Sequence, residues 1–438
     1  MDFGLVIFLI IVVIYTVVAV WLGRRSITMP MFFLAVGALI GANGLGYLNI
    51  SLSSETVRLL VEITLALLLF ADSSTLKLHQ LKDDAGLPAR LLGVALPLII
   101  ILGGLLAFVL FPQEGLGFAL LIGAILAPTD AALGLAIFTN RRVPVRIRRA
   151  LNVESGLNDG IATPFVTLFT ALAVAELTQK LTGWLAFAML DIAIAVAVGG
   201  VLGMSGGWLF AVAMRRRLTS RATEQIGTLA LGLAIYFSSI ALGGNGFIAA
   251  FVGGLFFSYV TRQRQHHAVE FTEAAGTLLS LFVWTIFGSI LVIPLFTVFN
   301  PLALLYAVLS LTLIRMLPVA LSLVGTHFRR DTKLVMGWLG PRGLASVVFT
   351  LIAFESFQEI ARPYQTLFAI AGWTILLSVV LHGFSGLPLA RWYANRLKTA
   401  PASIPELLEV PDLEPRQNRL ANLHQPSAML TDPYEDPG

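Results

Sequence analysis

Two short stretches of this apolar sequence place carboxylates beside polar or helix-breaking residues. Residues 127–130 read Ala-Pro-Thr-Asp, and residues 154–159 read Glu-Ser-Gly-Leu-Asn-Asp. At about 100° per residue on a helix, Glu154 lies over Asn158 and Ser155 lies over Asp159. Carboxylate and hydroxyl oxygens are hard ligands, which suit alkali cations by the logic that governs hard divalent ions. The spacing therefore predicts a cation site at Asp159 and Ser155, with Glu154 and Asn158 beside it as a supporting pair.

Two arginines, Arg315 and Arg342, also lie within apolar segments. An ionised side chain at the centre of a membrane helix costs roughly 2.5–3.5 kcal/mol on insertion scales, so both arginines need an anion, and the nearby carboxylates are the evident source. When ionised, Asp130, Glu154 and Asp159 carry three negative charges against two positive ones. The remaining carboxylate must take a proton or bind a cation. We assign this competition to Asp159, because Glu154 is better placed for an arginine.

Two prolines predict breaks in the helices that carry these residues. Pro128 lacks an amide hydrogen and disfavours helical geometry at Ala127, and Pro341 follows Gly340 in the run 340–343. Transporters use such interrupted helices to coordinate ions near the membrane midplane. The breaks fall in corresponding positions of the two halves, which predicts inverted repeats whose broken helices cross.

The composition places these residues in a membrane. Of the 438 residues, 57% are hydrophobic and 12% are charged, against about 25% charged in a soluble domain. Residues 3–22 precede Arg24 and Arg25, an order that suits a first membrane helix better than a cleaved signal. The chain has no cysteine, which excludes disulfides and thiolate metal sites. We expect an all-α integral membrane protein that binds no nucleic acid.

The apolar segments number thirteen. They are roughly 3–22, 31–49, 57–75, 90–111, 116–138, 150–174, 183–213, 224–242, 245–260, 272–295, 299–325, 332–354 and 365–389. The seventh is long enough to be one tilted helix or two segments.

Lysine and arginine are distributed unequally between the two sets of loops. Those after odd-numbered segments, with the stretch after segment 13, carry 22 cations, whereas the even-numbered loops carry three: Arg58, Lys180 and Arg362. Because cations collect on the cytoplasmic side, the N-terminus is expected outside and the C-terminus inside a plasma or inner membrane. Residues 399–438, rich in proline and acidic residues, are expected to form a largely disordered cytoplasmic tail.

The stretches Ala127-Pro-Thr-Asp130, Glu154-Ser-Gly-Leu-Asn-Asp-Gly160 and Gly340-Pro-Arg-Gly343 resemble the monovalent cation/proton antiporter superfamily, specifically its NhaP-like sodium/proton exchangers. The similarity covers about residues 1–395. It implies a homodimer, in which a core of about residues 90–174 and 299–389 moves like an elevator against a dimerisation scaffold of about residues 1–75 and 183–295.

The resemblance also implies roles for individual residues. Asp159 and Asp130 would bind the ion, with a hydroxyl from Ser155 and a backbone carbonyl from Thr129. Glu154 and Asn158 would pair with Arg315, and Arg342 would stabilise the break at Gly340-Pro341. Relatives with Asn-Asp at positions like 158–159 are generally electroneutral, so one-for-one exchange is expected. A glutamate is usual near the end of the third helix, where this chain has Ala71-Asp72, and many relatives lack a proline at the position of Pro341.

The leading hypothesis is a Na+/H+ antiporter that is not an enzyme and needs no cofactor, with Na+, K+ or Li+ and H+ as transported ions. The first alternative is the same machine with K+ preference, since the size of the site decides the ion. An intramembrane aspartyl protease using Asp130 and Asp159 is disfavoured, because two arginines would keep both carboxylates ionised. A non-transporting sensor on the same fold is a third alternative.

Other polar residues receive weaker predictions. Asp72 is either a vestibule carboxylate or a solvated helix end, and Asp191 is expected to make a structural polar contact. Arg58 and Glu62, four residues apart, predict a local ion pair. His266 and His267 are expected on a solvated face, and His382 is expected to be a hydrogen-bonded packing residue.

Overall fold

The computed structural model describes residues 3–48, 54–76, 86–138, 140, 142–261, 266–358, 365–398, 400–401 and 403–408. Within these residues all regular elements are helices, and a single β-bridge joins Gly41 and Leu48. Eight of the helices are long and apolar enough to cross a membrane, judged by length and composition. The expected all-α class is confirmed.

Every one of the thirteen predicted segments contains at least one helix. Those of the first seven segments are α1 (Phe3–Arg24), α2 (Met29–Ile40), α3 (Glu55–Thr75), α5 (Gly86–Arg90) continuing through a π-helical turn (Leu91–Ala95) into α6 (Leu96–Leu110), α7 (Leu116–Ile125) with α8 (Ala131–Phe138), α9 (Val145–Thr178) and α10 (Trp184–Arg215). Those of the remaining six are α11 (Arg221–Ala241), α12 (Gly246–Thr261), α13 (His266–Phe287) continuing through a π-helical turn (Gly288–Val292) into α14 (Ile293–Thr297), α15 (Pro301–Leu311) with α16 (Leu313–Ser322), α17 (Arg330–Trp338) with α18 (Leu344–Gln358), and α19 (Gln365–Leu397).

Several predicted boundaries were wrong. The second segment ends at Ile40 and is followed by turns, because Gly41 begins a series of backbone bonds that reach back to residues 37–41. The seventh segment is one helix of 32 residues. The eleventh is divided at Thr312, whose amide and hydroxyl both donate to the carbonyl of Val308, and this interruption was not anticipated. Arg148 and Arg149, counted as loop cations, are buried in the first turns of α9.

Both predicted breaks are present, and they touch each other. The fifth segment is interrupted between Ile125 and Ala131, and the twelfth between Trp338 and Leu344. The amide of Asp130 donates to the carbonyl of Pro341 over 2.8 Å. The backbones of the two interruptions are therefore hydrogen-bonded, and four half-helices meet at one point.

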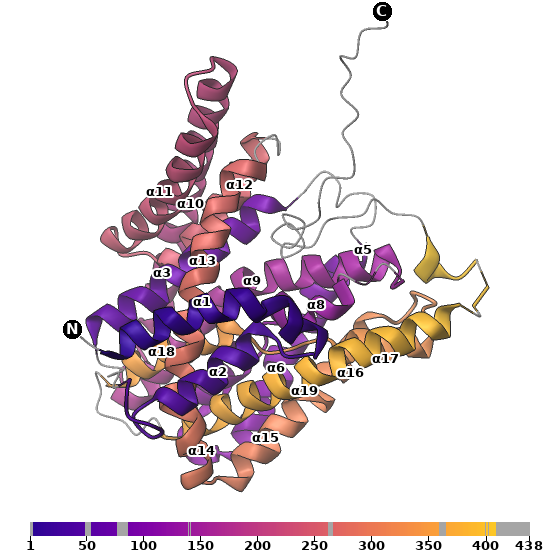
Figure 1. Ribbon diagram of the computed structural model, residues 1–438. Helices are drawn as coiled ribbons and strands as arrows, with labels where there is room; N and C mark the ends of the chain where they lie inside the picture. The colour runs from indigo at the N-terminus through magenta and orange to yellow at the C-terminus, as the bar shows by residue number, and fades with distance from the viewer. Residues whose placement is uncertain are drawn as a thin grey trace, which may run out of the picture.

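The molecule arranges its helices in two unequal groups around this crossing. Figure 1 shows α10, α11 and α12 extending together in one direction, and α16, α17 and α19 extending in another. Within these groups α10 packs along α12, and α15 packs along α19, while α9 contacts both α7 and α10. The long helix α9, which carries Glu154 and Asp159, thus joins α7, the helix before the first break, to α10.

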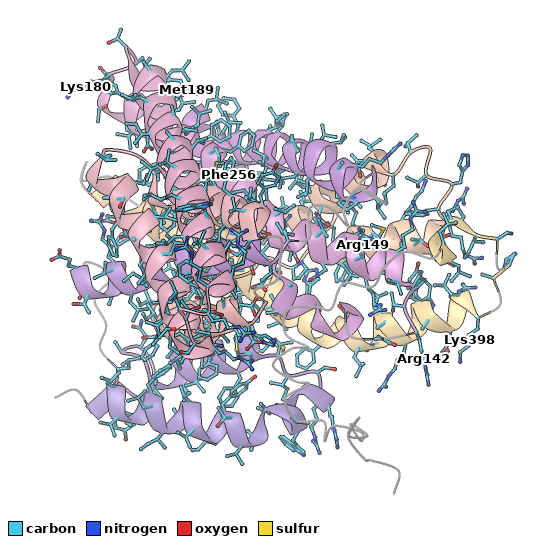
Figure 2. All side chains as sticks on the ribbon, turned by 90° about the horizontal axis from the view of Figure 1, so that it is seen from above. Arg142, Arg149, Lys180, Met189, Phe256 and Lys398 are labelled. Carbon is cyan, nitrogen blue, oxygen red and sulfur yellow. The ribbon has the colours of Figure 1, made fainter. Side chains whose placement is uncertain are left out.

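Three of the described cations mark two different ends of the molecule. Figure 2 shows Arg142 and Lys398 close together, with Lys180 far from both. Arg142 and Lys398 border one cavity, which Glu406 and Leu408 also line. Lys77, Lys82, Arg141, Arg262, Arg264 and Arg362 lie outside the described residues.

The start of the predicted disordered tail is packed. Pro405–Leu407 forms a 3-10 helix, and Glu406 is fully buried. Its carboxylate accepts hydrogen bonds from the amide of Arg329 and the hydroxyl of Thr332, which holds this segment against the beginning of α17. Residues 409–438 of that prediction lie outside the described residues.

Candidate functional site

A buried ion pair joins α9 to α16. Arg315 donates to Oε1 of Glu154 over 2.6 Å, with side chains that are 1% and 4% exposed. The guanidinium also donates to the carbonyl of Leu339 at the end of α17, over 3.3 Å. The structure thus brings Glu154 and Arg315 together, so the charges of both are met within the protein.

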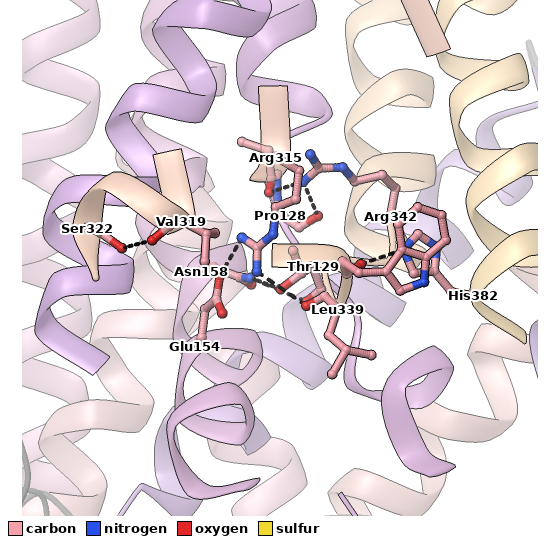
Figure 3. Close-up of polar contacts among 12 residues, drawn as sticks. Pro128, Thr129, Glu154, Asn158, Arg315, Val319, Ser322, Leu339, Arg342 and His382 are labelled. Carbon is pink, nitrogen blue, oxygen red and sulfur yellow. Dashed lines mark hydrogen bonds and ion pairs between the residues drawn. The ribbon is translucent and has the colours of Figure 1, made fainter. Parts of the chain in front are cut away.

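Asn158 makes a different contact from the one expected. Its amide donates to the hydroxyl of Thr129 over 2.5 Å and lies 3.4 Å from the Thr129 carbonyl oxygen, whereas the expected contact was with Arg315. The reason lies in the break of the fifth segment, which brings Thr129 to the face of α9 (Figure 3). Asn158 therefore attaches α9 to the break between α7 and α8.

Arg342 also differs from expectation, because its partners in the structure are carbonyl groups. Its guanidinium donates to the carbonyl of Ala127 over 2.5 Å, and the carbonyl oxygen of Pro128 lies 3.5 Å away. Its backbone amide donates to the hydroxyl of Ser378 on α19. The proline-induced break removes the helical donors that these carbonyls would otherwise meet, so the arginine of one break stabilises the other.

Asp130 lies at the start of two half-helices. One carboxylate oxygen accepts from the amide of Ala132 over 2.6 Å, and the other from the amide of Leu344 over 3.1 Å. A carboxylate at a helix N-terminus satisfies free amides and is favoured by the helix dipole. Asp130 therefore joins the start of α8 to the start of α18.

Glycine is required where the breaks approach each other. A Cβ atom on Gly343 would overlap the side chain of Asp130, and one on Gly340 would overlap the guanidinium of Arg315. The sequence Gly340-Pro-Arg-Gly343 therefore permits both the Asp130 contact and the Arg315 contact.

Ser155 and Asp159 lie on the same face of α9, one turn apart. Ser155 is buried, and its hydroxyl oxygen has no hydrogen-bond partner among the described residues. The side-chain oxygen of Asn158 is likewise buried without a partner there. Asp159 is half-buried, and its backbone carbonyl accepts from Thr163. Two buried side-chain oxygens that lack a partner among the described residues thus lie within one turn before Asp159 on α9, and oxygens of this kind are the ligands that a small cation needs.

A support for the second break was not recognised from the sequence as part of the site. His382 of α19 is buried, with its ring nitrogens 2.9 Å from the carbonyl oxygens of Ser378 and Trp338, and its ring stacks on Trp338. The expected hydrogen-bonded packing role is confirmed. Because Ser378 accepts the Arg342 amide, the i,i+4 spacing of Ser378 and His382 is the signal that both face the break.

The remaining candidates lie elsewhere. Asp72 is half-buried in the last turn of α3, and the backbone carbonyl of Asp191 accepts from the amide of Asn245. The Arg58–Glu62 pair is confirmed, at 2.9 Å. His267 is solvent-exposed, as predicted, and its ring also contacts Glu270, whereas the side chain of His266 lies outside the described residues.

Comparison with protein families gives one match that spans most of the chain. Residues 7–392 match the family described as sodium/hydrogen exchanger, transmembrane. The chain is 28% identical over 374 residues to the K+/H+ antiporter NhaP of Alkalimonas amylolytica, an alignment that covers 84% of this chain and 63% of that protein. It is 26% identical over 370 residues to the Na+/H+ antiporter ApNhaP of Aphanothece halophytica, with 81% and 68% covered.

Two further comparisons concern length and fold. The K+/H+ antiporter NhaP2 of Shewanella sp. strain ANA-3 is 26% identical over 386 residues, covering 87% of this chain and 65% of that protein. The chain thus spans less than two thirds of these two K+/H+ antiporters. Among solved structures, the sodium proton antiporter MjNhaP1 of Methanocaldococcus jannaschii superimposes with a TM-score of 0.72 at 21% identity, covering 89% of this chain and 98% of that chain. This likeness shows a shared fold.

Proposed function

The chain belongs to the sodium/hydrogen exchanger family, whose model matches residues 7–392, and on this premise we propose that it exchanges Na+ for H+ across a membrane, one for one, at Asp159. The observation that carries the proposal is the buried hydroxyl of Ser155, which lacks a hydrogen-bond partner among the described residues one turn before Asp159. A sodium ion on Asp159 would use that oxygen.

The charges around the site favour Asp159 over the other two carboxylates. Glu154 is bound to Arg315 in a buried ion pair at 2.6 Å, so its charge already has a partner within the protein. Asp130 accepts two backbone amide hydrogens, from Ala132 and Leu344, so both of its carboxylate oxygens already have partners. Asp130, Glu154 and Asp159 carry three negative charges against the two positive charges of Arg315 and Arg342, and we assign the competition between a proton and a monovalent cation to Asp159.

Competition for that charge gives coupled exchange. A proton and Na+ each neutralise the Asp159 carboxylate, so each displaces the other, and the loaded site carries the same charge in both forms. One-for-one exchange is then electroneutral, as relatives with the Asn-Asp sequence generally are.

The proposal includes a division of labour between helices. The core of about residues 90–174 and 299–389 contains α9 and both broken helices, which the Glu154, Asn158 and Arg342 contacts hold together. The scaffold of about residues 1–75 and 183–295 would stay fixed, as part of a homodimer, while the core moves. The distribution of cations supports an N-terminus outside and a C-terminus in the cytoplasm.

Exchange of K+ for H+ is the second candidate. Two of the relatives that align with 84% and 87% of this chain are named K+/H+ antiporters, whereas the relative from Aphanothece is named a Na+/H+ antiporter. The same carboxylate and hydroxyl would serve either ion, and the radius of the site decides between them.

Transport by purified protein in proteoliposomes tests the proposal. With an imposed pH gradient, Na+ should dissipate the gradient in the parent and fail to do so in Asp159→Asn, because the amide can no longer alternate between charged and neutral forms. Asp191→Asn, which removes a carboxylate from α10, a helix of the proposed scaffold, is the matched control and should retain exchange. Parallel assays with K+ and Li+ separate the two candidate ions, and exchange that survives Asp159→Asn would refute the assignment.

A further inference from the structure

An ion pair links α3 to α18 at one end of the molecule. The guanidinium of Arg58, in the first turn of α3, pairs with the carboxylate of Glu355, in the last turn of α18. Both side chains are partly exposed, and they border a cavity of about 270 Å³ between the two helices. In the proposed division, α3 belongs to the scaffold and α18 to the core, so this pair crosses the boundary between them.

Arg58 is held from the scaffold side. Its Nε atom donates to Oε1 of Glu62 over 2.9 Å, and the other oxygen of Glu62 accepts from the hydroxyl of Tyr236 on α11 over 3.0 Å. All three residues are on scaffold helices. Because this network orients the guanidinium toward α18, a movement of the core would separate Glu355 from Arg58 and leave the rest of the network in place.

A second polar contact crosses the same boundary. The amide of Asn245 donates to the hydroxyl of Thr167 on α9 over 2.9 Å. The side-chain oxygen of Asn245 accepts from the amides of Phe247 and Ile248, which caps the start of α12. Asn245 is thus fixed to a scaffold helix, while Thr167 lies eight residues beyond Asp159 on a core helix.

Both contacts lie on the same side of the ion site. Arg58 lies in the first turn of α3 and Glu355 in the last turn of α18, and Asn245 lies in the turn between α11 and α12. Helix α9 begins near Arg142 and Lys398, at the cation-rich end, and reaches Thr167 only after Asp159. The proposed orientation therefore places both contacts on the outer side of the membrane.

We infer that the Arg58–Glu355 ion pair and the Asn245–Thr167 hydrogen bond form an outer latch that keeps the Asp159 site closed to the outer solution. The inference rests on the proposed function, in which the core slides against the scaffold in each cycle. Since each contact joins a fixed helix to a moving one, both must break before the site opens outward and re-form when it closes.

The latch is weak enough to open in every cycle. Solvent-exposed ion pairs of this kind stabilise by at most about 1 kcal/mol, which corresponds to a change of about fivefold in a conformational equilibrium. Removing the pair should therefore increase the outward-open population by up to about fivefold without trapping the protein there.

The absence of cysteine from the chain gives a direct assay. Val166→Cys places a single thiol at a buried position of α9, two turns beyond Asp159 on the same face. In vesicles with the native outer face exposed, the rate of modification by a membrane-impermeant thiol reagent reports outer access. We expect that rate to rise by up to about fivefold in Arg58→Gln and in Glu355→Gln. The double variant should match the single ones, because each breaks the same pair.

Glu55→Gln is the matched control, since it removes a carboxylate from the same cavity and leaves the pair intact. Its modification rate should equal that of the parent. An unchanged rate in both Arg58→Gln and Glu355→Gln, with exchange intact, overturns the latch alone. Na+/H+ exchange by the parent chain is measured separately in proteoliposomes. An absence of exchange there would contradict the proposed function, whatever the thiol modification rates are.

Discussion

At the scale of residues, the polar groups of this protein satisfy one another in a pattern that the sequence predicted only in part. That the buried arginines need a carboxylate followed from charge, because each is too costly to leave alone in a membrane, and the family resemblance implied the pairing of Glu154 with Arg315. The partners of Asn158 and Arg342 did not follow, since both bind groups that only the broken backbone exposes. Sequence patterns report charge and helix faces, whereas carbonyls released by a break appear only in three dimensions.

The buried pair gives a prediction about stability. Glu154→Gln leaves Arg315 without its carboxylate, and Arg315→Gln leaves the carboxylate without its cation, so each should lower the unfolding free energy by about 3–5 kcal/mol, the scale for breaking a buried pair. Thermal unfolding of the purified protein in detergent measures this as a lower Tm.

Two further variants make that result specific. The double variant Glu154→Gln/Arg315→Gln should lose less than the sum of the single variants, because no uncompensated charge remains. Arg330→Gln, an exposed arginine at the start of α17, should leave Tm unchanged. Single variants that melt like the parent would show that the pair does not stabilise the fold.

At the scale of elements, the two interrupted helices were predictable and the third interruption was not. Pro128 and Pro341 mark their breaks in the sequence, because proline removes a donor and restricts the preceding residue. Thr312 carries no comparable signal, since threonine occurs in many unbroken helices. The crossing could be anticipated from the matched positions, but the hydrogen bond from Asp130 to Pro341 could not.

The crossing is tested by Gly343→Ala. The added Cβ would overlap the side chain of Asp130, so either the half-helices must separate or the carboxylate must leave the amides of α8 and α18. We expect slower Na+/H+ exchange and a lower Tm. Gly93→Ala is the matched control, because a Cβ there meets nothing within 4 Å and alanine favours the helical backbone. Equal exchange by both variants would contradict the close packing at the crossing.

At the scale of the whole molecule, apolar length and cation placement indicated thirteen segments, and each contains a helix. The contacts between distant segments were beyond such patterns, because a hydrophobic helix face fits many partners equally well. The tail shows this limit: its composition predicted disorder, yet Glu406 is buried against α17. The average composition of a segment cannot indicate that one acidic side chain is buried against the start of a particular helix.

The packed segment 403–408 connects helices that are remote in sequence, and this gives a last prediction. Glu406 accepts from the amide of Arg329 and the hydroxyl of Thr332, which also contacts the hydroxyl of Tyr393 on α19, while Arg146 of α9 donates to the carbonyl of Pro405. The segment and its contacts therefore link α9, α17 and α19.

Glu406→Ala leaves the partly buried amide of Arg329 and the buried hydroxyl of Thr332 without their acceptor, a loss of about 1–3 kcal/mol, so Tm should fall while the ion site keeps its own contacts. Glu406→Gln retains an acceptor oxygen and should lose less. Lys398→Gln, an exposed charge that borders the same cavity, should not change Tm. Because the segment stabilises α17 ahead of its break, Glu406→Ala should also slow exchange, with cation preference unchanged. A normal Tm with altered cation preference would instead place the effect of Glu406 on the ion site itself.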